Sequence, residues 1–179
     1  FDRGNCAAQD IRHVVNVSTV YATPRFSNNT LRLLAGDWQV SGIVRLRTGS
    51  NFTVSSGVDT SLTGKISRAN QVLGDPYAAS KTIDQWLNPA AFVMPAPGTL
   101  GNMGRNTLVG PGLVQVDMGL SRTFSVREKQ TVQFRIEAFN LPNHVNPGNP
   151  AATLNAPNFG RITSGSDPRI LQLALKYVF

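Results

Sequence analysis

The residue types that most often carry out chemistry in proteins are few in this sequence and far apart. The chain has one cysteine, Cys6, and two histidines, His13 and His144. Neither histidine has a cysteine or clustered carboxylates at the spacing of zinc or iron ligands, so we expect no metal site. A single cysteine cannot form an internal disulfide bond, and no nucleophile, base and orienting group form a set. Gly101-Asn-Met-Gly104 lacks the spacing of a phosphate-binding loop. We therefore expect neither an enzyme nor a cofactor site.

Many of the charged side chains lie in segments where polar and apolar residues alternate. Alternation with a period of two is typical of β-strands that have one polar and one apolar face. Five segments show it, at residues 12–21, 37–54, 113–126, 131–140 and 170–179. The charged residues that we place on the polar faces are Arg45, Arg47, Asp117, Arg135, Glu137 and Lys176. We expect these charges to face water or one another, for example Arg135 paired with Asp117 on a neighbouring strand.

Two residues break the alternation. Ile43 lies among the polar residues of the second segment, and Arg122 lies among the apolar residues of the third. If the apolar face contacts lipid, a charge at mid-depth would cost about 2–4 kcal/mol. Arg122 therefore suits a position near a membrane boundary.

Composition and connection lengths favour a membrane β-barrel within the all-β class. The 179 residues have a net charge of +7, and the mean hydropathy is −0.12. No stretch approaches the roughly 18 consecutive apolar residues of a membrane helix, whereas strands of about 9–11 residues suit a tilted crossing. Short and long connections alternate as in outer-membrane barrels, with four residues at 127–130 and long loops at 55–112 and 141–169.

The connections contain two predicted helical stretches. Leu31–Leu34, in the connection of middling length at 22–36, could form a helical turn. Within Lys81–Phe92, a short helix is expected to end before Pro89. The aromatic, Pro and Gly content of loop 55–112 predicts an ordered cap rather than a linker.

Several stretches together resemble the C-terminal part of TonB-dependent outer-membrane receptors. The resemblance is to the Oar-like group, which carries a carboxypeptidase-regulatory-like N-terminal domain. It covers nearly the whole chain, and its specificity lies in the order and spacing of the motifs. One departure is Leu141-Pro142, where the group has Phe after Leu. The matching stretches are Asp10–His13, Gly36–Ile43, Trp86–Phe92, Gly101–Asn106, Gly110–Gly112, Phe134–His144, Phe159–Thr163 and Pro168–Phe179.

The resemblance implies an antiparallel transmembrane segment of a barrel of about 22 strands, located in the bacterial outer membrane. The five strands would form a curved open sheet, with residues 127–130 in the periplasm and both long loops outside the cell. The implied function is energised ligand uptake. The implied partners are lipid and lipopolysaccharide, the outer-membrane assembly machinery, and a plug domain and TonB acting through a missing N-terminal part.

The resemblance and the pattern together assign roles to three further groups of residues. The C-terminal assembly signal would comprise Gln172, Ala174 (where the pattern has Gly), Tyr177 and Phe179. An aromatic girdle at the periplasmic strand ends would comprise Tyr21, Trp38, Phe124, Tyr177 and Phe179. A share of an extracellular ligand site would fall to Arg68, Tyr77, Trp86, Phe92, Asn102, Arg105 and Asn106.

Two alternative functions remain open from the sequence. A soluble all-β binding or adhesin-like module would pack its apolar faces sheet on sheet. A nucleic-acid binder would fit the sequence pI of about 10.3. The basic residues, however, are dispersed with no run of four, so we expect no nucleic-acid partner.

Overall fold

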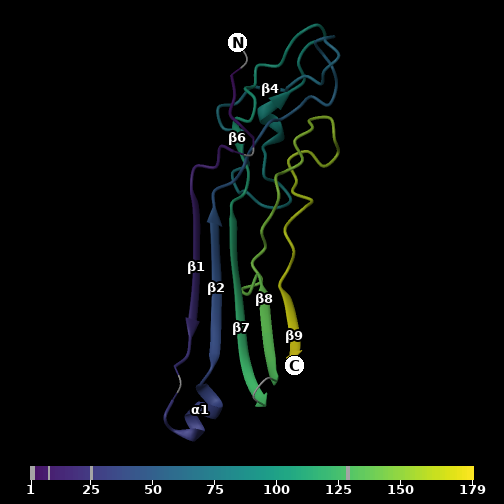
Figure 1. Ribbon diagram of the computed structural model, residues 1–179. Coiled ribbons are helices and arrows are strands. Elements are labelled where there is room, and N and C mark those ends of the chain that lie inside the picture. The colour runs from purple at the N-terminus through teal and green to yellow at the C-terminus, as the bar shows by residue number, and fades with distance from the viewer. Residues whose placement is uncertain (1–2, 8, 25, 128–129) are drawn as a thin grey trace. The chain divides into compact units, whose positions relative to one another are not determined.

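The computed structural model describes residues 3–7, 9–24, 26–127 and 130–179 (Figure 1). The chain divides into two compact units. The first, called here the loop unit, contains Arg47–Leu113, Asn146–Ser166 and the N-terminal residues through His13. The second, the sheet unit, contains Val14–Leu46, Val114–Val145 and Asp167–Phe179. No helix in the described part of the chain is long and apolar enough to cross a membrane.

Five long strands form one open sheet in the order β1-β2-β7-β8-β9. Neighbouring strands run antiparallel, as the arrows of β1, β2 and β7 show in Figure 1 and as the β7–β8 and β8–β9 registers establish. The all-β prediction and its five strands are confirmed. The strands are β1 Val14–Ala22, β2 Trp38–Arg47, β7 Leu113–Arg127, β8 Gln130–Phe139 and β9 Ile170–Val178.

The register of the sheet gives it one apolar and one polar face. Leu120, Ile136 and Leu173 lie opposite one another across three strands. Residues directly opposite in an antiparallel pair share a face, so these side chains form one apolar row. One residue further along, Ser121, Arg135 and Ala174 form a row on the other face. The alternation predicted from the sequence is therefore continuous from strand to strand.

Away from the end of the sheet where α1 packs on Arg122, much of the apolar face is left open by the described residues of the sheet unit. On β9, Leu171, Leu173 and Leu175 are 65%, 70% and 73% exposed. Val15 and Val17 on β1 are about half exposed. A row of exposed leucines of this kind indicates a surface that contacts an apolar medium or partner.

A short helix, α1 (Asn29–Ala35), precedes β2 and confirms the predicted turn at Leu31–Leu34. Asn28 caps it, because its side-chain oxygen accepts hydrogen bonds from the backbone N–H groups of Thr30 and Leu31. At the other end, the Gly36 N–H donates to the Arg32 carbonyl.

The loop unit has its own hydrophobic core, and loop 55–112 is ordered within this unit, as its composition predicts. Val54 and Leu87 are fully buried at its centre. Two short strand pairs flank the core, β3 (Asn51–Phe52) with β6 (Leu108–Val109) and β4 (Asn70–Gln71) with β5 (Phe92–Val93). The buried members of the core are Phe52, Val54, Ala69, Leu87, Ala91, Phe92, Met103 and Leu108.

The predicted second strand, 37–54, is wrong in its last part, because β2 ends at Arg47. A Cβ at Gly49 would overlap the Gly110 carbonyl oxygen, so the two segments meet only because this residue has no side chain. Beyond this approach, Asn51 and Phe52 pair with Val109 and Leu108 within the loop unit.

The helix predicted within Lys81–Phe92 is also wrong. A 3-10 turn, η1 (Pro89–Ala91), begins at Pro89 instead of ending before it. The preceding backbone is held by distant partners, since the Trp86 N–H donates to the Gly160 carbonyl and the Ala78 N–H to the Trp86 carbonyl. Proline at the first position of a helical turn needs no N–H, which explains the start at Pro89.

The other predicted strand bounds differ from the structure by at most two residues. The fourth strand ends at Phe139 rather than at 140, because Asn140 has a positive φ of 51°. Of the predicted short turn at 127–130, residues 128 and 129 lie outside the described part of the chain.

Candidate functional site

The polar face of the sheet unit is organised around Asp117 on β7. One carboxylate oxygen accepts a hydrogen bond from the Arg45 guanidinium at 2.7 Å, and the other accepts one from the Asn140 backbone N–H at 2.9 Å. The Gln115 amide donates to both oxygens. The Asp117 side chain is 11% exposed and the Arg45 side chain 48% exposed. This group ties together β2, β7 and the end of β8.

The predicted pairing of Arg135 with Asp117 is wrong. The β7–β8 register places Arg135 opposite Ser121, four residues along β7 from Asp117. Its guanidinium instead lies 3.5 Å from a carboxylate oxygen of Glu137 on the same strand. Lys176 on β9 lies opposite Gln133, on the same polar face.

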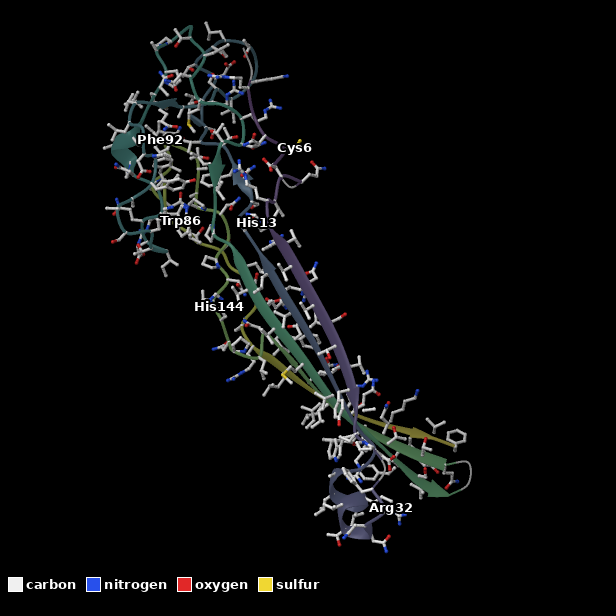
Figure 2. All side chains as sticks on the ribbon, turned by 90° about the vertical axis from the view of Figure 1, so that its left-hand side faces the viewer. Cys6, His13, Arg32, Trp86, Phe92 and His144 are labelled. Carbon is white, nitrogen blue, oxygen red and sulfur yellow. The ribbon has the colours of Figure 1, made fainter. Side chains whose placement is uncertain are left out.

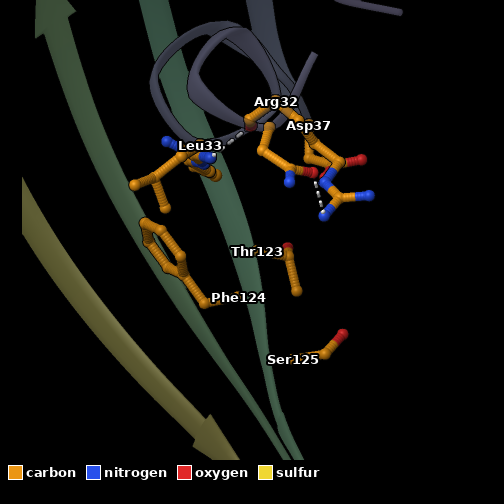
Figure 3. A pocket seen from close by; sticks show the side chains of 8 residues that line it. Arg32, Leu33, Asp37, Thr123, Phe124 and Ser125 are labelled. Carbon is orange, nitrogen blue, oxygen red and sulfur yellow. Dashed lines mark hydrogen bonds between the residues drawn. The ribbon is translucent and has the colours of Figure 1, made fainter. Parts of the chain in front are cut away.

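Arg122 is the exception on the apolar face, and the structure encloses it. Arg122 is 8% exposed, and its guanidinium carbon lies 5.3 Å from the Trp38 ring centroid and 4.7 Å from that of Phe124. It donates a hydrogen bond of 3.2 Å to the Arg32 carbonyl of α1. The Arg122 Nε–H has no partner among the described residues. An adjoining recess of about 500 Å³ is lined by Arg32, Leu33, Asp37 and Phe124, among others (Figure 3).

The predicted girdle aromatics occupy one end of the sheet unit. Tyr21 is near the end of β1, Trp38 begins β2, and Phe124 and Tyr177 are near the ends of β7 and β9. Because neighbouring strands run antiparallel, these positions fall at the same end of the sheet.

The residues predicted as an assembly signal lie on or just after β9. Gln172 and Ala174 lie on the polar face, opposite Glu137 and Arg135. Tyr177 lies on the apolar face, and its ring centroid is 6.0 Å from that of Phe179, which follows the strand and is 90% exposed.

Of the aromatic residues predicted for a ligand site, Trp86 and Phe92 are labelled in Figure 2, and all three contribute to the packing of the loop unit. Phe92 is buried in the core and packs edge to face against Phe159, at 5.6 Å between ring centroids. Trp86 and Tyr77 pack against the same core. The Tyr77 hydroxyl accepts from the Val109 N–H at 2.8 Å, so these rings stabilise the loops.

The predicted polar loop residues also join segments of the loop unit. Asn102 accepts from the Gln71 N–H at 2.7 Å, and Asn106 accepts from the Thr53 hydroxyl at 3.0 Å. Arg105 forms an isolated bridge with Gly4, and Arg68 forms one with Ser55.

A polar recess in the loop unit was not identified from the sequence. It measures about 240 Å³ and brings together four segments that are distant in the chain. Of its residues, only Arg47 was singled out by alternation. Others lie in predicted strands or in the stretch Gly110–Gly112 that carries the resemblance, but nothing in the sequence indicates that they line a recess. The lining residues are Arg47, Ser50, Pro111, Gly112, Leu113, Asn146, Pro147, Gly148, Asn149, Ser164, Gly165 and Ser166.

In the described part of the chain, the carboxyl groups and histidines do not gather into a possible metal site. No group of three or more His, Cys, Asp or Glu side chains suited to a metal is found among the described residues. Cys6 is exposed.

A two-faced sheet of long antiparallel strands with an exposed apolar face is typical of a transmembrane β-barrel wall. A family model described as an outer membrane beta barrel domain matches residues 1–172. The chain belongs to this outer membrane β-barrel domain family. No curated protein and no solved structure matches the chain.

Membership of the outer membrane β-barrel domain family explains why the sheet has one apolar and one polar face. The chain is part of a bacterial outer membrane protein, and its long strands form barrel wall. In such a wall the apolar face contacts lipid, and the polar face, with Asp117 and Arg45, lines the interior. Arg122 is then the cation that this β-barrel domain must shield from lipid, which Trp38 and Phe124 do.

Proposed function

We propose that this domain is part of the wall of a TonB-dependent transporter, which takes up a ligand across the outer membrane with energy from the inner-membrane TonB complex. The observation that carries the proposal is the loop unit. Long connections that form a compact unit with a buried core suit a receptor, whose loops must hold a fixed shape to bind a ligand. An open diffusion pore has no such requirement.

The sequence motifs shared with TonB-dependent receptors support the same proposal. Trp86–Phe92 and Phe159–Thr163 both contribute to the loop-unit core, through Leu87, Phe92 and the packed Phe159 ring. Proteins that have the same folded loop unit would share the sequence motifs that build its core.

The proposal assigns partners to each part of the domain. The apolar face contacts outer-membrane lipid, and basic loop residues face lipopolysaccharide. The C-terminal strand is recognised by the outer-membrane assembly machinery. A plug domain fills a larger barrel, of which the five strands are a part, and binds TonB. No catalytic activity and no nucleic-acid binding belong to the proposal.

The soluble all-β module is the weaker candidate. It requires a partner layer over the apolar face, and the β9 leucines remain at least 65% exposed. The match to an outer membrane family also argues against it.

Binding to TonB tests the proposal directly. The full-length protein, purified in detergent, should bind the periplasmic domain of TonB from the same bacterium. Removal of the segment N-terminal to the plug should abolish this binding while the barrel stays folded. A full-length protein that has no plug, does not bind TonB and conducts ions as a permanently open pore in planar bilayers would contradict the proposal.

A further inference from the structure

The polar recess of the loop unit has one charged side chain, Arg47, and no acidic residue among the residues that line it. Arg47 is exposed, and its side chain has no hydrogen bond or ion pair within the described ranges of the chain. A guanidinium presents several N–H donors in a rigid planar fork, which matches the two oxygens of a carboxylate. The recess is therefore suited to an anion with this geometry.

The groups around Arg47 are hydroxyls and amides rather than further charges. Ser164 and Ser166 contribute hydroxyls that no other described residue engages, and Asn149 contributes a side-chain amide. The Asn149 carbonyl oxygen accepts from the Ser50 hydroxyl at 3.3 Å, which leaves the NH₂ group to donate elsewhere. Such groups pair with ligand hydroxyls as well as with a carboxylate.

The frame of the recess is held by backbone contacts. The Gly148 N–H donates to the Ser164 carbonyl at 2.8 Å, and the Ser166 N–H donates to the Asn146 carbonyl at 2.9 Å. A Cβ at Gly148 would come within 2.5 Å of the Ser164 hydroxyl, so glycine permits this close pairing. The backbone around the recess is therefore ordered before a ligand binds, which lowers the entropic cost of binding.

The size and the apolar part of the lining limit the ligand. A volume of about 240 Å³ is about eight times the roughly 30 Å³ that one water occupies in the liquid. This accommodates one sugar-sized ring. Pro111, Leu113 and Pro147 supply apolar surface for the C–H face of such a ring.

We propose that this recess binds a sugar acid, with the carboxylate on Arg47 and the ring hydroxyls on Asn149, Ser164 and Ser166. The inference rests on the proposed function, since it names the class of ligand that the receptor takes up. The ligand is either a free uronic acid or a unit of an acidic polysaccharide, because both present the same carboxylate and hydroxyls.

The test is a calorimetric titration of the purified full-length protein with D-galacturonate, D-galactose, acetate and trigalacturonate. Galacturonate should bind at least about tenfold more tightly than galactose or acetate, since each of these lacks half of the recognised groups. Tighter binding of trigalacturonate identifies a polysaccharide as the source, and equal binding identifies the free sugar acid. Either result supports the proposal.

Three variants separate recognition from folding. Arg47→Gln should lower galacturonate affinity by about tenfold, whereas Arg161→Gln, which removes an exposed arginine paired with Asp84 in the same unit, should leave it unchanged. Asn149→Asp keeps the oxygen that accepts from Ser50 but adds a negative charge. It should weaken binding of galacturonate more than that of galactose, because both ligands lose the NH₂ donor and only galacturonate also meets charge repulsion.

The proposal is overturned if galacturonate binds no better than galactose, or if Arg161→Gln and Arg47→Gln weaken binding equally. TonB binding, measured on the same preparation, shows which hypothesis has failed. Loss of TonB binding with galacturonate binding intact counts against the transporter, and the opposite result counts against the sugar-acid site alone.

Discussion

Asp117 shows how one polar side chain on the inner face of the wall connects several strands. Its carboxylate accepts from the Arg45 guanidinium, the Gln115 amide and the Asn140 backbone N–H. Asn140 is buried and has a positive φ, so its N–H depends on this acceptor. Arg45 is half exposed and can be hydrated by water without the carboxylate. The acceptor role of Asp117 should therefore matter more to stability than the ion pair.

Substitution of Asp117 by Ala should lower the free energy of unfolding by about 1–3 kcal/mol, because a buried backbone donor loses its acceptor. Arg45→Gln should cost less than about 1 kcal/mol, because the ion pair is partly solvated. Urea unfolding of the full-length protein in lipid vesicles, followed by tryptophan fluorescence, measures both. Asp117→Asn, which keeps an acceptor oxygen, is the control. Equal losses for Arg45→Gln and Asp117→Ala would show that the ion pair dominates.

Asp59 organises the turn at residues 59–64 of the loop unit. Desolvation acts to raise the pKa of its carboxyl, but hydrogen bonds from the Gly64 and Thr63 backbone N–H groups and from Ser61 outweigh it and hold the pKa below the ordinary value of 3.8. The pKa of Asp59 is therefore lower in the folded protein than in the unfolded chain. Its contribution to stability is present above pH 3.8 and is lost as the pH falls through the lowered folded pKa.

Hydrogen exchange should therefore show the segment 59–64 well protected at pH 5 and less protected at pH 3, after correction for the intrinsic exchange rate. Asp59→Ala should remove this pH dependence by removing the protection at both pH values. The turn at residues 82–85 is the internal control, because a hydroxyl, that of Thr82, accepts from the Gln85 N–H there. Loss of protection in both turns together would point to unfolding of the whole loop unit instead.

At the scale of elements, Arg122 holds α1 against the sheet. The guanidinium lies close to the rings of Trp38 and Phe124 and donates to a carbonyl of the helix. A seven-residue helix is too short to be stable alone in water, so α1 depends on such contacts. A cation placed on the lipid-facing side is costly unless it is enclosed, and the helix encloses it.

Arg122→Ala should loosen α1 without unfolding the strands. We expect the amide protons of residues 32–36 to exchange at least about tenfold faster, the change that a loss of 1.4 kcal/mol in local stability produces. Amide exchange of β8 should change little. Arg135→Ala, which removes a half-exposed arginine from the other face, is the control. Unchanged exchange in α1 would show that Trp38 and the chain connection suffice to hold it.

The C-terminal element offers a test in cells. Deletion of Phe179 from the full-length protein should lower the amount inserted in the outer membrane, because the resemblance assigns this residue to the signal that the assembly machinery reads. Phe179→Tyr keeps an aromatic ring and should insert normally. Insertion is measured by heat-modifiable mobility in outer-membrane fractions. Normal insertion of the deletion would show that Phe179 is not part of the signal.

The sequence predicted the five strands and both faces, because alternation reports directly which side of a strand meets an apolar medium. It did not predict that Arg135 lies opposite Ser121, because register depends on the pairing of whole strands. The end of β2 at Arg47 depends on the approach of Gly49 to Gly110, 61 positions away. The sugar-acid recess was missed for the same reason, since its four segments meet only in the folded loop unit.

At the scale of the whole molecule, the barrel wall contacts lipid on one face and water on the other. A mean hydropathy of −0.12 describes neither face, because it averages a lipid-facing set with a polar set and the loops. The matching apolar rows on β7, β8 and β9 show that the separation into faces is maintained across the sheet. The wall should therefore tolerate a charge on one face of a strand and not on the other.

Leu120 and Thr123 lie on opposite faces of β7 and test this separation. Leu120, at the middle of the strand, faces Ile136 in the apolar row, and Thr123 faces Gln133 in the polar row. Leu120→Arg should lower the free energy of folding into lipid vesicles by about 2–4 kcal/mol, because the charge enters lipid near the midplane. Thr123→Arg should change it by less than about 1 kcal/mol, since the added guanidinium stays in water. Similar losses for the two variants would mean that both faces meet the same medium, and the assignment of the apolar face to lipid would then be wrong.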